Sequence, residues 1–320
     1  MVSGFLLALS TMVMHTQAAP TTFSMPSTVT GTAYKNGCTS NCALVIMLHG
    51  INGNGPDFAT DAGFQNTFTG IIAYPSETDS NGGWPTSSSD SHWASNLAKM
   101  EALIAMPEVD QSKVYLLGFS NGGFFAFALM CAIGDRLRGI AISAGLYEQQ
   151  TLGCPHRTNL LQLHNANDNY NLPIDPPASK GVIQWGVPTS IRREWLDATT
   201  YPDASTNGAS GVTTGDFTLY AATQGNLRFD YYSYNGPAGH MYLVYSGSPS
   251  GAPGGMAQNA YINSYLTALS TAGSSPTPTP TPAPPTSSPT TSPGSADDAH
   301  ILALPSVVLL ALLTQLLNGA

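Results

Sequence analysis

Short apolar runs alternate along the chain with longer stretches whose apolar residues recur at helical spacing. The apolar runs predict strands at Leu44–Leu48, Gly70–Ala73, Lys113–Leu117, Gly139–Ser143, Leu160–His164 and Phe229–Tyr234. The helical spacing predicts helices at Trp93–Ala105, Phe124–Ile133, Ser190–Ala198 and Met256–Leu269. Apolar strands that alternate with helices are typical of a parallel sheet with both faces covered. We therefore expect an α/β fold with a mostly parallel, doubly wound sheet and helices on both faces.

The pentapeptide Gly118–Gly122 reads GFSNG and has the pattern G-x-S-x-G. The apolar run Val114–Leu117 comes before it, and a helix-compatible run, Phe124–Cys131, follows. This strand–turn–helix context predicts a nucleophile elbow, in which Ser120 stands at the tip of a strained turn. The alternative is a glycine- and serine-rich turn that only joins two buried elements.

A nucleophilic serine needs a general base, and four histidines follow Ser120 in the chain. His240 is the candidate, because it lies in a Gly/Pro loop directly after the last predicted strand. His164 ends a predicted core strand and is expected to be a wall or supporting residue. His156 precedes any plausible acid, and His300 lies in the C-terminal tail. In this type of fold the expected chain order is serine, acid, histidine.

Asp168 is the candidate acid, because it lies in the loop after the predicted strand Leu160–His164. A carboxylate there would orient the imidazole and stabilise the imidazolium formed during acyl transfer. Asp175 and Asp230 are backup acids. The competing interpretation of Asp168 is an Asx-turn in an asparagine-rich loop. A calcium loop is less favoured, because Asp168 is the only carboxylate in that cluster.

The buried run Ala43–Leu48 ends in His-Gly, and a glycine-rich loop follows it. In hydrolases of this kind a backbone N–H of that loop joins the N–H after the nucleophile to bind the oxyanion. Here these groups are the backbone amides of Ile51 and Asn121. The alternative is a glycine-rich loop without a ligand. A phosphate-binding loop is not expected, because its Lys and Ser/Thr are absent.

The family resemblance rests on motifs spread over residues 34–270. These are His49-Gly50, Gly53–Phe58, Tyr74-Pro75, Val109-Asp110, Val114-Tyr115, Gly118–Gly123 and Gly239-His240. Together they resemble the α/β-hydrolase esterases that include polyhydroxybutyrate depolymerases, feruloyl esterases and acetylxylan esterases. The resemblance implies an α/β-hydrolase fold, and it implies that Ser120, Asp168 and His240 are the family's serine, acid and histidine.

Two positions depart from the family pattern. Where the family often has Trp-Pro-Gly after its histidine, this chain continues Met241–Tyr245, and the segment before the acid reads Asn165–Asp168 instead of Gly-x-x-Asp. The resemblance implies ester substrates, either esters of plant cell-wall polysaccharides or polyhydroxyalkanoates, and these departures leave the choice open. Candidate substrate-stacking residues are Trp84, Trp93 and Trp185, with burial in the core as the commoner fate of tryptophan.

The composition is typical of an extracellular protein. Charged residues make up 9% of the 320-residue chain, and the net charge is −9, whereas soluble proteins usually have about 25% charged residues. The negative charge argues against nucleic acid and against anionic membrane surfaces as partners. No C-x-x-C pair or Cys/His cluster has zinc-site spacing, so we expect no metal. We also expect a monomer without a cofactor.

Both chain ends predict export to the cell surface. Residues 1–19 have a short apolar stretch and a small-residue cleavage site, as in a secretory signal peptide, followed by a catalytic domain at 20–272. Residues 273–295 form a Ser/Thr/Pro-rich linker, and 296–320 resemble a GPI-attachment signal that is removed. The rival interpretation is a C-terminal transmembrane helix, which would then be the only membrane contact.

An extracellular location makes two disulfides the expected state of the four cysteines. The sequence allows three connectivities. We favour Cys38–Cys42, before the first core strand, and Cys131–Cys154, which the family resemblance supports.

The residues together predict a cell-surface serine esterase. Two other functions stay open. One is a serine peptidase, because the same three residues hydrolyse amides. The other is a catalytically inactive hydrolase-fold protein kept for surface binding, against which the complete set Ser120, Asp168 and His240 argues.

Overall fold

The computed structural model describes residues 19–77, 82–145, 156, 158–165, 168, 212–214, 217–224, 227–234, 240 and 258–271. The chain divides into two compact units, Met1–Pro278 and Thr279–Ala320, and every described residue belongs to the first. The predicted signal peptide, linker and GPI signal, the predicted helix Ser190–Ala198, and Cys154, Asp175, Trp185 and His300 all lie outside the described residues.

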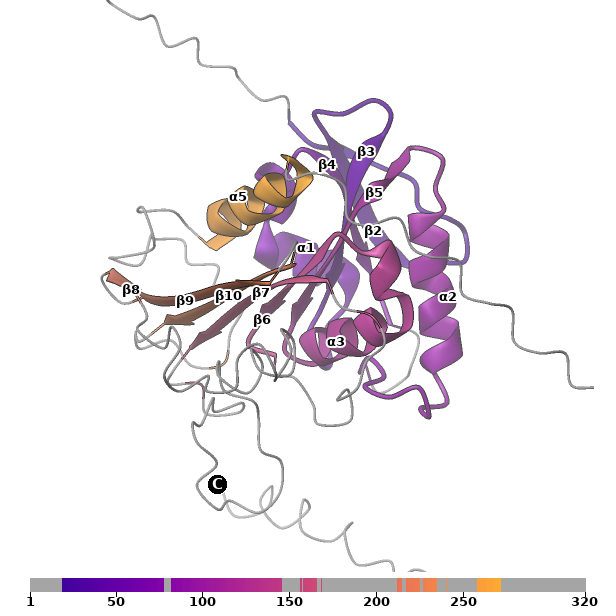
Figure 1. Ribbon diagram of the computed structural model, residues 1–320. Coiled ribbons are helices and arrows are strands. Elements are labelled where there is room, and N and C mark those ends of the chain that lie inside the picture. Colours follow the sequence, from indigo (N-terminus) through magenta and orange to yellow (C-terminus); the bar gives the residue numbers. More distant parts are fainter. Residues whose placement is uncertain are drawn as a thin grey trace, which may run out of the picture. The chain divides into compact units, whose positions relative to one another are not determined.

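A single mixed sheet forms the centre of the described part (Figure 1). Its strands are β1 (Thr21–Thr22), β2 (Gly31–Asn36), β3 (Cys42–Leu48), β4 (Gly70–Pro75), β5 (Val109–Phe119), β6 (Gly139–Ser143), β7 (Asn159–Asn165), β8 (Val212–Thr214), β9 (Phe217–Gln224) and β10 (Leu227–Tyr234). They lie in the order β1-β2-β4-β3-β5-β6-β7-β10-β9-β8. Neighbouring strands pair in parallel along the central part of this order, β4-β3-β5-β6-β7-β10. Antiparallel strands extend the sheet at both edges, with β2 and β1 at one and β9 and β8 at the other.

Helices cover both faces of the sheet. They are α1 (Gly55–Ala62), α2 (Trp93–Ile104), α3 (Asn121–Ile133) and α5 (Gln258–Thr271), with 3-10 turns η1 (Phe64–Asn66) and η2 (Gly134–Arg136). Figure 1 shows α2 and α3 on one side of the sheet and α1 and α5 on the other. This is the α/β-hydrolase type of fold, as the sequence predicted.

The central strand β3 shows why both faces are apolar. Successive side chains of a strand point to opposite faces. Leu44 and Ile46 lie in the core cluster with α2 and α3, whereas Val45 and Met47 lie in the cluster with α1 and α5. All four side chains are fully buried. A strand buried on both faces therefore appears in the sequence as an unbroken apolar run.

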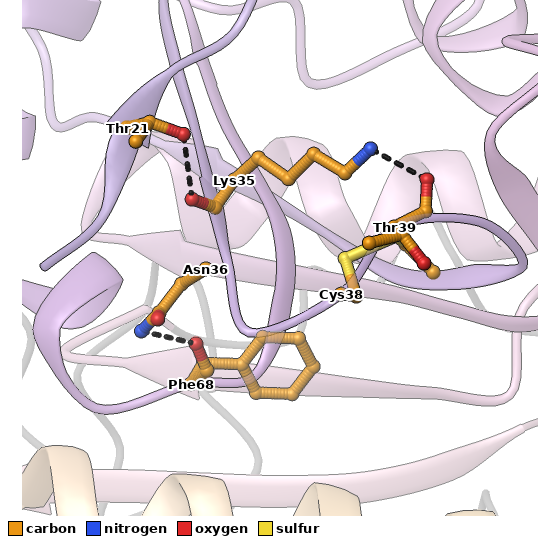
Figure 2. Close-up of a disulfide and its surroundings, with 7 residues drawn as sticks. Thr21, Lys35, Asn36, Cys38, Thr39 and Phe68 are labelled. Atoms are coloured by element: carbon orange, nitrogen blue, oxygen red, sulfur yellow. Dashed lines mark hydrogen bonds between the residues drawn. A yellow bond between two sulfur atoms is a disulfide. The ribbon is translucent and has the colours of Figure 1, made fainter. Parts of the chain in front are cut away.

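A short clasp joins β2 to β3 (Figure 2). Cys38 and Cys42 form a disulfide, which confirms this predicted pair. Lys35 Nζ donates to Thr39 O at 2.8 Å, and the Asn36 side chain donates to Phe68 O at 3.2 Å. Cys131 is also disulfide-bonded, but its predicted partner lies outside the described residues. The clasp fixes the entry to the central strand.

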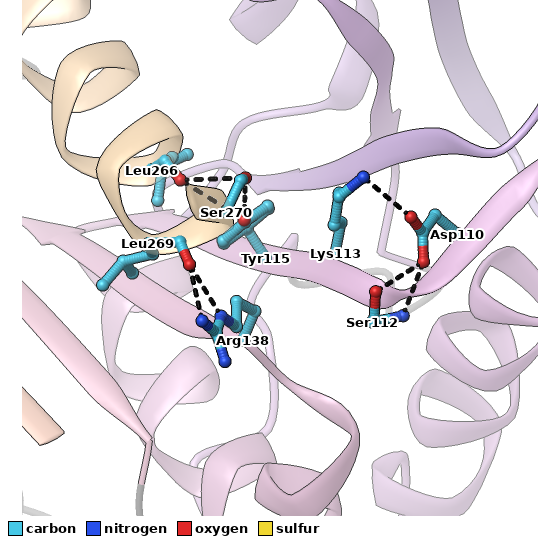
Figure 3. Close-up of polar contacts among 8 residues, drawn as sticks. All are labelled: Asp110, Ser112, Lys113, Tyr115, Arg138, Leu266, Leu269 and Ser270. Atoms are coloured by element: carbon cyan, nitrogen blue, oxygen red, sulfur yellow. Dashed lines mark hydrogen bonds and ion pairs between the residues drawn. The ribbon is translucent and has the colours of Figure 1, made fainter. Parts of the chain in front are cut away.

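The C-terminal end of α5 is held against the sheet by polar contacts (Figure 3). Arg138 donates from Nε and Nη2 to Leu269 O at 2.9 and 2.6 Å. A cation at the C-terminus of a helix also interacts favourably with the helix dipole. Tyr115 Oη and Ser270 Oγ lie 2.6 Å apart in a further hydrogen bond. These contacts bind the last described helix to β5 and to the segment before β6.

Within the described residues we find no helix that is both long and apolar enough to cross a membrane. The predicted C-terminal anchor lies outside them.

Candidate active site

Ser120 lies at the junction of β5 and α3, in a conformation that few residues adopt. Its φ is +51° and its ψ is −120°. A non-glycine residue held at positive φ is strained, and such residues concentrate at functional sites. A Cβ on Gly118 would lie 2.3 Å from Gly122 O, and one on Gly122 would lie 2.3 Å from Leu48 O. Glycine is therefore required at both positions for the tight turn that the sequence predicted.

The structure brings Ser120, His240 and Asp168 together in one chain of hydrogen bonds. His240 Nε2 lies 2.7 Å from Ser120 Oγ, and His240 Nδ1 lies 2.8 Å from Asp168 Oδ2. A carboxylate has only acceptors, so Nδ1 carries the proton and Nε2 is left to accept from the serine hydroxyl. Asp168 is fully buried, and 15% of the His240 side chain is exposed.

His164 supports the acid from the other side. At the end of β7, its Nε2 lies 3.3 Å from Asp168 Oδ2, the same oxygen that His240 contacts, and its side chain is fully buried. The backbone N–H of Asp168 donates to Asn165 O at 3.0 Å, which ties the acid to the end of β7. His164 therefore has the supporting position that the sequence indicated.

The backup acid Asp230 contacts Arg228 and Tyr261. It is fully buried in β10 and forms an ion pair with Arg228. The Tyr261 hydroxyl also donates to Asp230, at 3.3 Å. Asp230 therefore holds α5 against β10. Asp175, the other backup acid, lies outside the described residues.

The prediction that Trp84 stacks on substrate is wrong. Only 3% of Trp84 is exposed. Its ring lies parallel to Phe125 at 5.1 Å and against His49 at 4.9 Å. Trp84 lies in the core because its indole Nε1 donates to His49 O and its ring packs on Phe125. Trp93, at the start of α2, packs edge-on against the same Phe125 and is partly buried.

The residues of the two predicted oxyanion donors both lie close to Gly83: a Cβ there would be 3.7 Å from Ile51 Cγ1 and 3.8 Å from Asn121 Oδ1. Asn121 is the first residue of α3, a 13-residue helix. The first N–H groups of a helix have no partner inside it and carry the positive end of the helix dipole. Ile51 lies in the turn after β3 and is 62% exposed. The arrangement suits a developing negative charge next to Ser120.

His49, before that turn, is a structural histidine that sequence reasoning treated only as part of a motif. Its Nδ1 lies 2.8 Å from Gly50 O, and Glu77 N donates to its Nε2 at 3.4 Å. Burial lowers the pKa of His49 below its usual value. The ring is therefore neutral at pH 7, as its accepting Nε2 requires.

In the described part of the chain, no group of three or more His, Cys, Asp or Glu side chains is arranged to hold a metal ion.

The known proteins to which this chain is similar include esterases. No family model matches the chain. The chain is 27% identical over 142 residues to the probable feruloyl esterase C of Aspergillus terreus (strain NIH 2624 / FGSC A1156). The match covers 41% of this chain and 50% of that protein, so the chain spans about half the length of the relative. The resemblance to α/β-hydrolase esterases read from the motifs is thereby confirmed.

Solved structures with a similar arrangement include two esterases. An acetyl xylan esterase from Aspergillus awamori has a TM-score of 0.48 at 16% identity, covering 67% of this chain and 90% of that one. The Bacillus cereus carboxylesterase has a TM-score of 0.44 at 11% identity, covering 74% and 92%. Likenesses at this level say nothing of function, which has to come from the residues of the site.

Proposed function

We propose that this protein is a serine carboxylic-ester hydrolase in which Ser120 is the nucleophile, His240 the general base and Asp168 the acid that orients it. The observation that carries the proposal is the continuous contact from Asp168 Oδ2 through both His240 nitrogens to Ser120 Oγ. The strained turn at Ser120 supports it, because such strain persists only where the surrounding structure enforces it.

The geometry supports a two-step acyl transfer. Ser120 Oγ attacks the ester carbonyl carbon while its proton passes to His240 Nε2. The C–O bond to the leaving alcohol then breaks, and His240 returns the proton to that alcohol. In the second step water attacks the acyl-enzyme while His240 takes a proton from the water and returns it to Ser120 Oγ. This step releases the carboxylic acid product and restores Ser120. Asp168 stabilises the imidazolium in both steps.

The carbonyl oxygen becomes negatively charged in each tetrahedral intermediate. We assign its stabilisation to the backbone N–H groups of Asn121 and Ile51. Removing one such donor from a serine hydrolase costs about 10²–10³ in kcat. The position of Asn121 at the N-terminus of α3 supports this assignment, because the helix dipole favours an anion there.

For the substrate class, the similarity to a probable feruloyl esterase supports feruloyl esters. The family resemblance also implies acetyl esters of plant cell-wall polysaccharides. Polyhydroxyalkanoate is the other polymer that the family resemblance implies. The deciding experiment compares short- and long-chain acyl esters, feruloyl esters, acetylated xylan and polyhydroxybutyrate, each with wild type and Ser120→Ala. Turnover of at least one ester by wild type, lost in Ser120→Ala, supports the proposal. Peptide cleavage without ester cleavage would favour the peptidase, and neither activity would favour the inactive binding protein.

His164 offers a prediction about how the acid is held. Removing its contact to Asp168 by His164→Ala should lower kcat about 10- to 100-fold, because hydrogen bonds to charged groups contribute about 1.5–3 kcal/mol. His164→Gln places an amide donor near the position of Nε2 and should recover most of that loss. Steady-state kinetics of the two folded variants makes the comparison. Equal losses in both would mean that His164 acts through packing alone.

For location, we propose a secreted protein with a signal peptide at 1–19, attached to the cell surface by a GPI anchor after the linker at 273–295. The disulfide Cys38–Cys42 supports an oxidising compartment. Phosphatidylinositol-specific phospholipase C should release the protein from cells. Retention of the protein after digestion that releases another GPI-anchored marker would contradict the anchor.

A further inference from the structure

Trp84 and Asn121 form a bridge that sequence reasoning did not foresee. Trp84 N donates to Asn121 Oδ1 at 2.6 Å, and Asn121 Nδ2 donates to Trp84 O at 3.1 Å. The amide side chain therefore pairs with the backbone of one residue through both of its polar atoms. Asn121 is also the residue whose own N–H is the proposed oxyanion donor. Its backbone position is thus tied to the loop after β4.

The same short loop holds the other half of the proposed oxyanion hole. The indole Nε1 of Trp84 donates to His49 O at 3.0 Å. Gly82 O accepts from Asn52 N at 2.8 Å. These two bonds fall on either side of Ile51, which carries the second proposed donor. Four hydrogen bonds thus join Gly82–Trp84 to both donor segments, two bonds to each.

Packing fixes Trp84 in this arrangement. Its ring is parallel to Phe125, with an interplanar angle of 8°, and Phe125 lies in the first turns of α3. The ring also contacts His49, and only 3% of the residue is exposed. A side chain enclosed in this way cannot change rotamer without opening the core. Trp84 therefore acts as a spacer of fixed size between the turn after β3 and the start of α3.

We propose that the Asn121 side chain and Trp84 are positioning residues that set the separation and direction of the two oxyanion-binding N–H groups. The inference rests on the proposed function. Oxyanion stabilisation depends on donors held 2.7–3.1 Å from the place where the charge develops, and a displacement of about 1 Å can cost roughly 10²-fold in rate. Only proline removes a backbone N–H, and it also restricts the backbone conformation. Substituting the side chains that hold the two segments therefore tests the position of the donors without removing them.

Two variants each remove one hydrogen bond between Trp84 and a donor segment with little change of shape. Asn121→Asp keeps the acceptor for Trp84 N but places a carboxylate oxygen against Trp84 O. Trp84→Phe keeps an aromatic ring on Phe125 but loses the donor to His49 O. Asn66→Asp, at an exposed position in η1, controls for the added net charge. Trp84→Phe adds no charge, so a loss that it shares with Asn121→Asp does not come from repulsion between the new carboxylate and the oxyanion.

The readout separates the transition state from the ground state. With a p-nitrophenyl ester, we expect kcat to fall about 10- to 100-fold in both variants, while KM changes little. The affinity for a trifluoromethyl ketone, whose tetrahedral adduct carries the oxyanion, should fall by a similar factor. Asn66→Asp should match wild type in all three quantities. Thermal unfolding and near-UV circular dichroism identify variants that are folded before these values are compared.

Folded Asn121→Asp and Trp84→Phe with wild-type kcat and wild-type ketone affinity would overturn the proposal. A rise in KM with unchanged kcat would do so as well, because it would place Trp84 and Asn121 in substrate binding. If either variant fails to fold, the other decides. Ser120→Ala is measured in parallel. If Ser120→Ala keeps full activity, the proposed function itself fails. If Ser120→Ala loses activity while Asn121→Asp and Trp84→Phe keep wild-type activity, only the positioning role of Asn121 and Trp84 is rejected.

Discussion

Ser120→Ala and His240→Ala should each lower kcat by roughly 10⁶-fold, and the double variant should be no slower than either one. The two groups act as a unit, because the serine hydroxyl attacks only while the imidazole accepts its proton. The distance of 2.7 Å between His240 Nε2 and Ser120 Oγ is the structural basis. Residual rate in each variant should exceed the rate in water, because the oxyanion donors remain.

The measurement is kcat for the best ester of the substrate panel, corrected for buffer hydrolysis, in the two single variants and the double variant. Ser88→Ala is a matched control, because Ser88 is exposed and lies away from the elbow in the sequence. It should have wild-type kcat. Multiplying losses in the double variant would contradict the account, because the two side chains would then act independently.

Gly122→Val should destabilise the fold by more than about 3 kcal/mol, and enough to prevent folding if the chain cannot adjust. A Cβ at Gly122 would lie 2.3 Å from Leu48 O and 2.5 Å from His49 O. Both are backbone atoms at the end of the central strand, so neither can turn aside as a side chain would. Relief requires α3 to move away from β3, which would also displace Ser120.

Urea unfolding of wild type and variant gives the free energy of unfolding. Gly63→Ala serves as a comparison, because Gly63 has a φ of +58° but its Cβ would meet nothing nearer than 3.7 Å. It should lose about 1–2 kcal/mol through backbone conformation alone. If Gly122→Val and Gly63→Ala had equal free energies of unfolding, a side chain at position 122 would not clash with the backbone of β3, and this part of the account would be contradicted.

The sequence predicted the core of the fold well and its edges poorly. Strand β6 has the predicted bounds, and β3, β4, β5, β7 and β10 extend the predicted runs by a few residues. Most of these strands are apolar runs and are therefore conspicuous, whereas β10 was predicted from alternating apolar and polar residues. Strands β1, β2, β8 and β9 were not predicted, because edge strands carry mixed polar residues. Helix α1, whose start in Asn54-Gly55-Pro56 was taken for a loop, was not predicted either.

At the site, three signals together selected Ser120, Asp168 and His240: the G-x-S-x-G context, the positions in loops at strand ends, and the order along the chain. The structure joins the three residues by hydrogen bonds. The position of Trp84 was not predictable in this way. Its burial depends on contacts of residues 82–84 with two segments distant in the sequence, and no local pattern encodes those contacts. One signal for this contact was available in the sequence. The side-chain amide of Asn121 has both a donor and an acceptor, so it can bind the backbone N–H and C=O of another residue.

The central claim is that Ser120 is a nucleophile activated by His240. A fluorophosphonate probe tests it most directly, because such a probe labels activated serines, and mass spectrometry of the digested protein locates the label. We predict one label on folded wild type, at Ser120, retained in Ser88→Ala and lost in Ser120→Ala and His240→Ala. No label on folded wild type, or a label that persists in Ser120→Ala, would contradict the account.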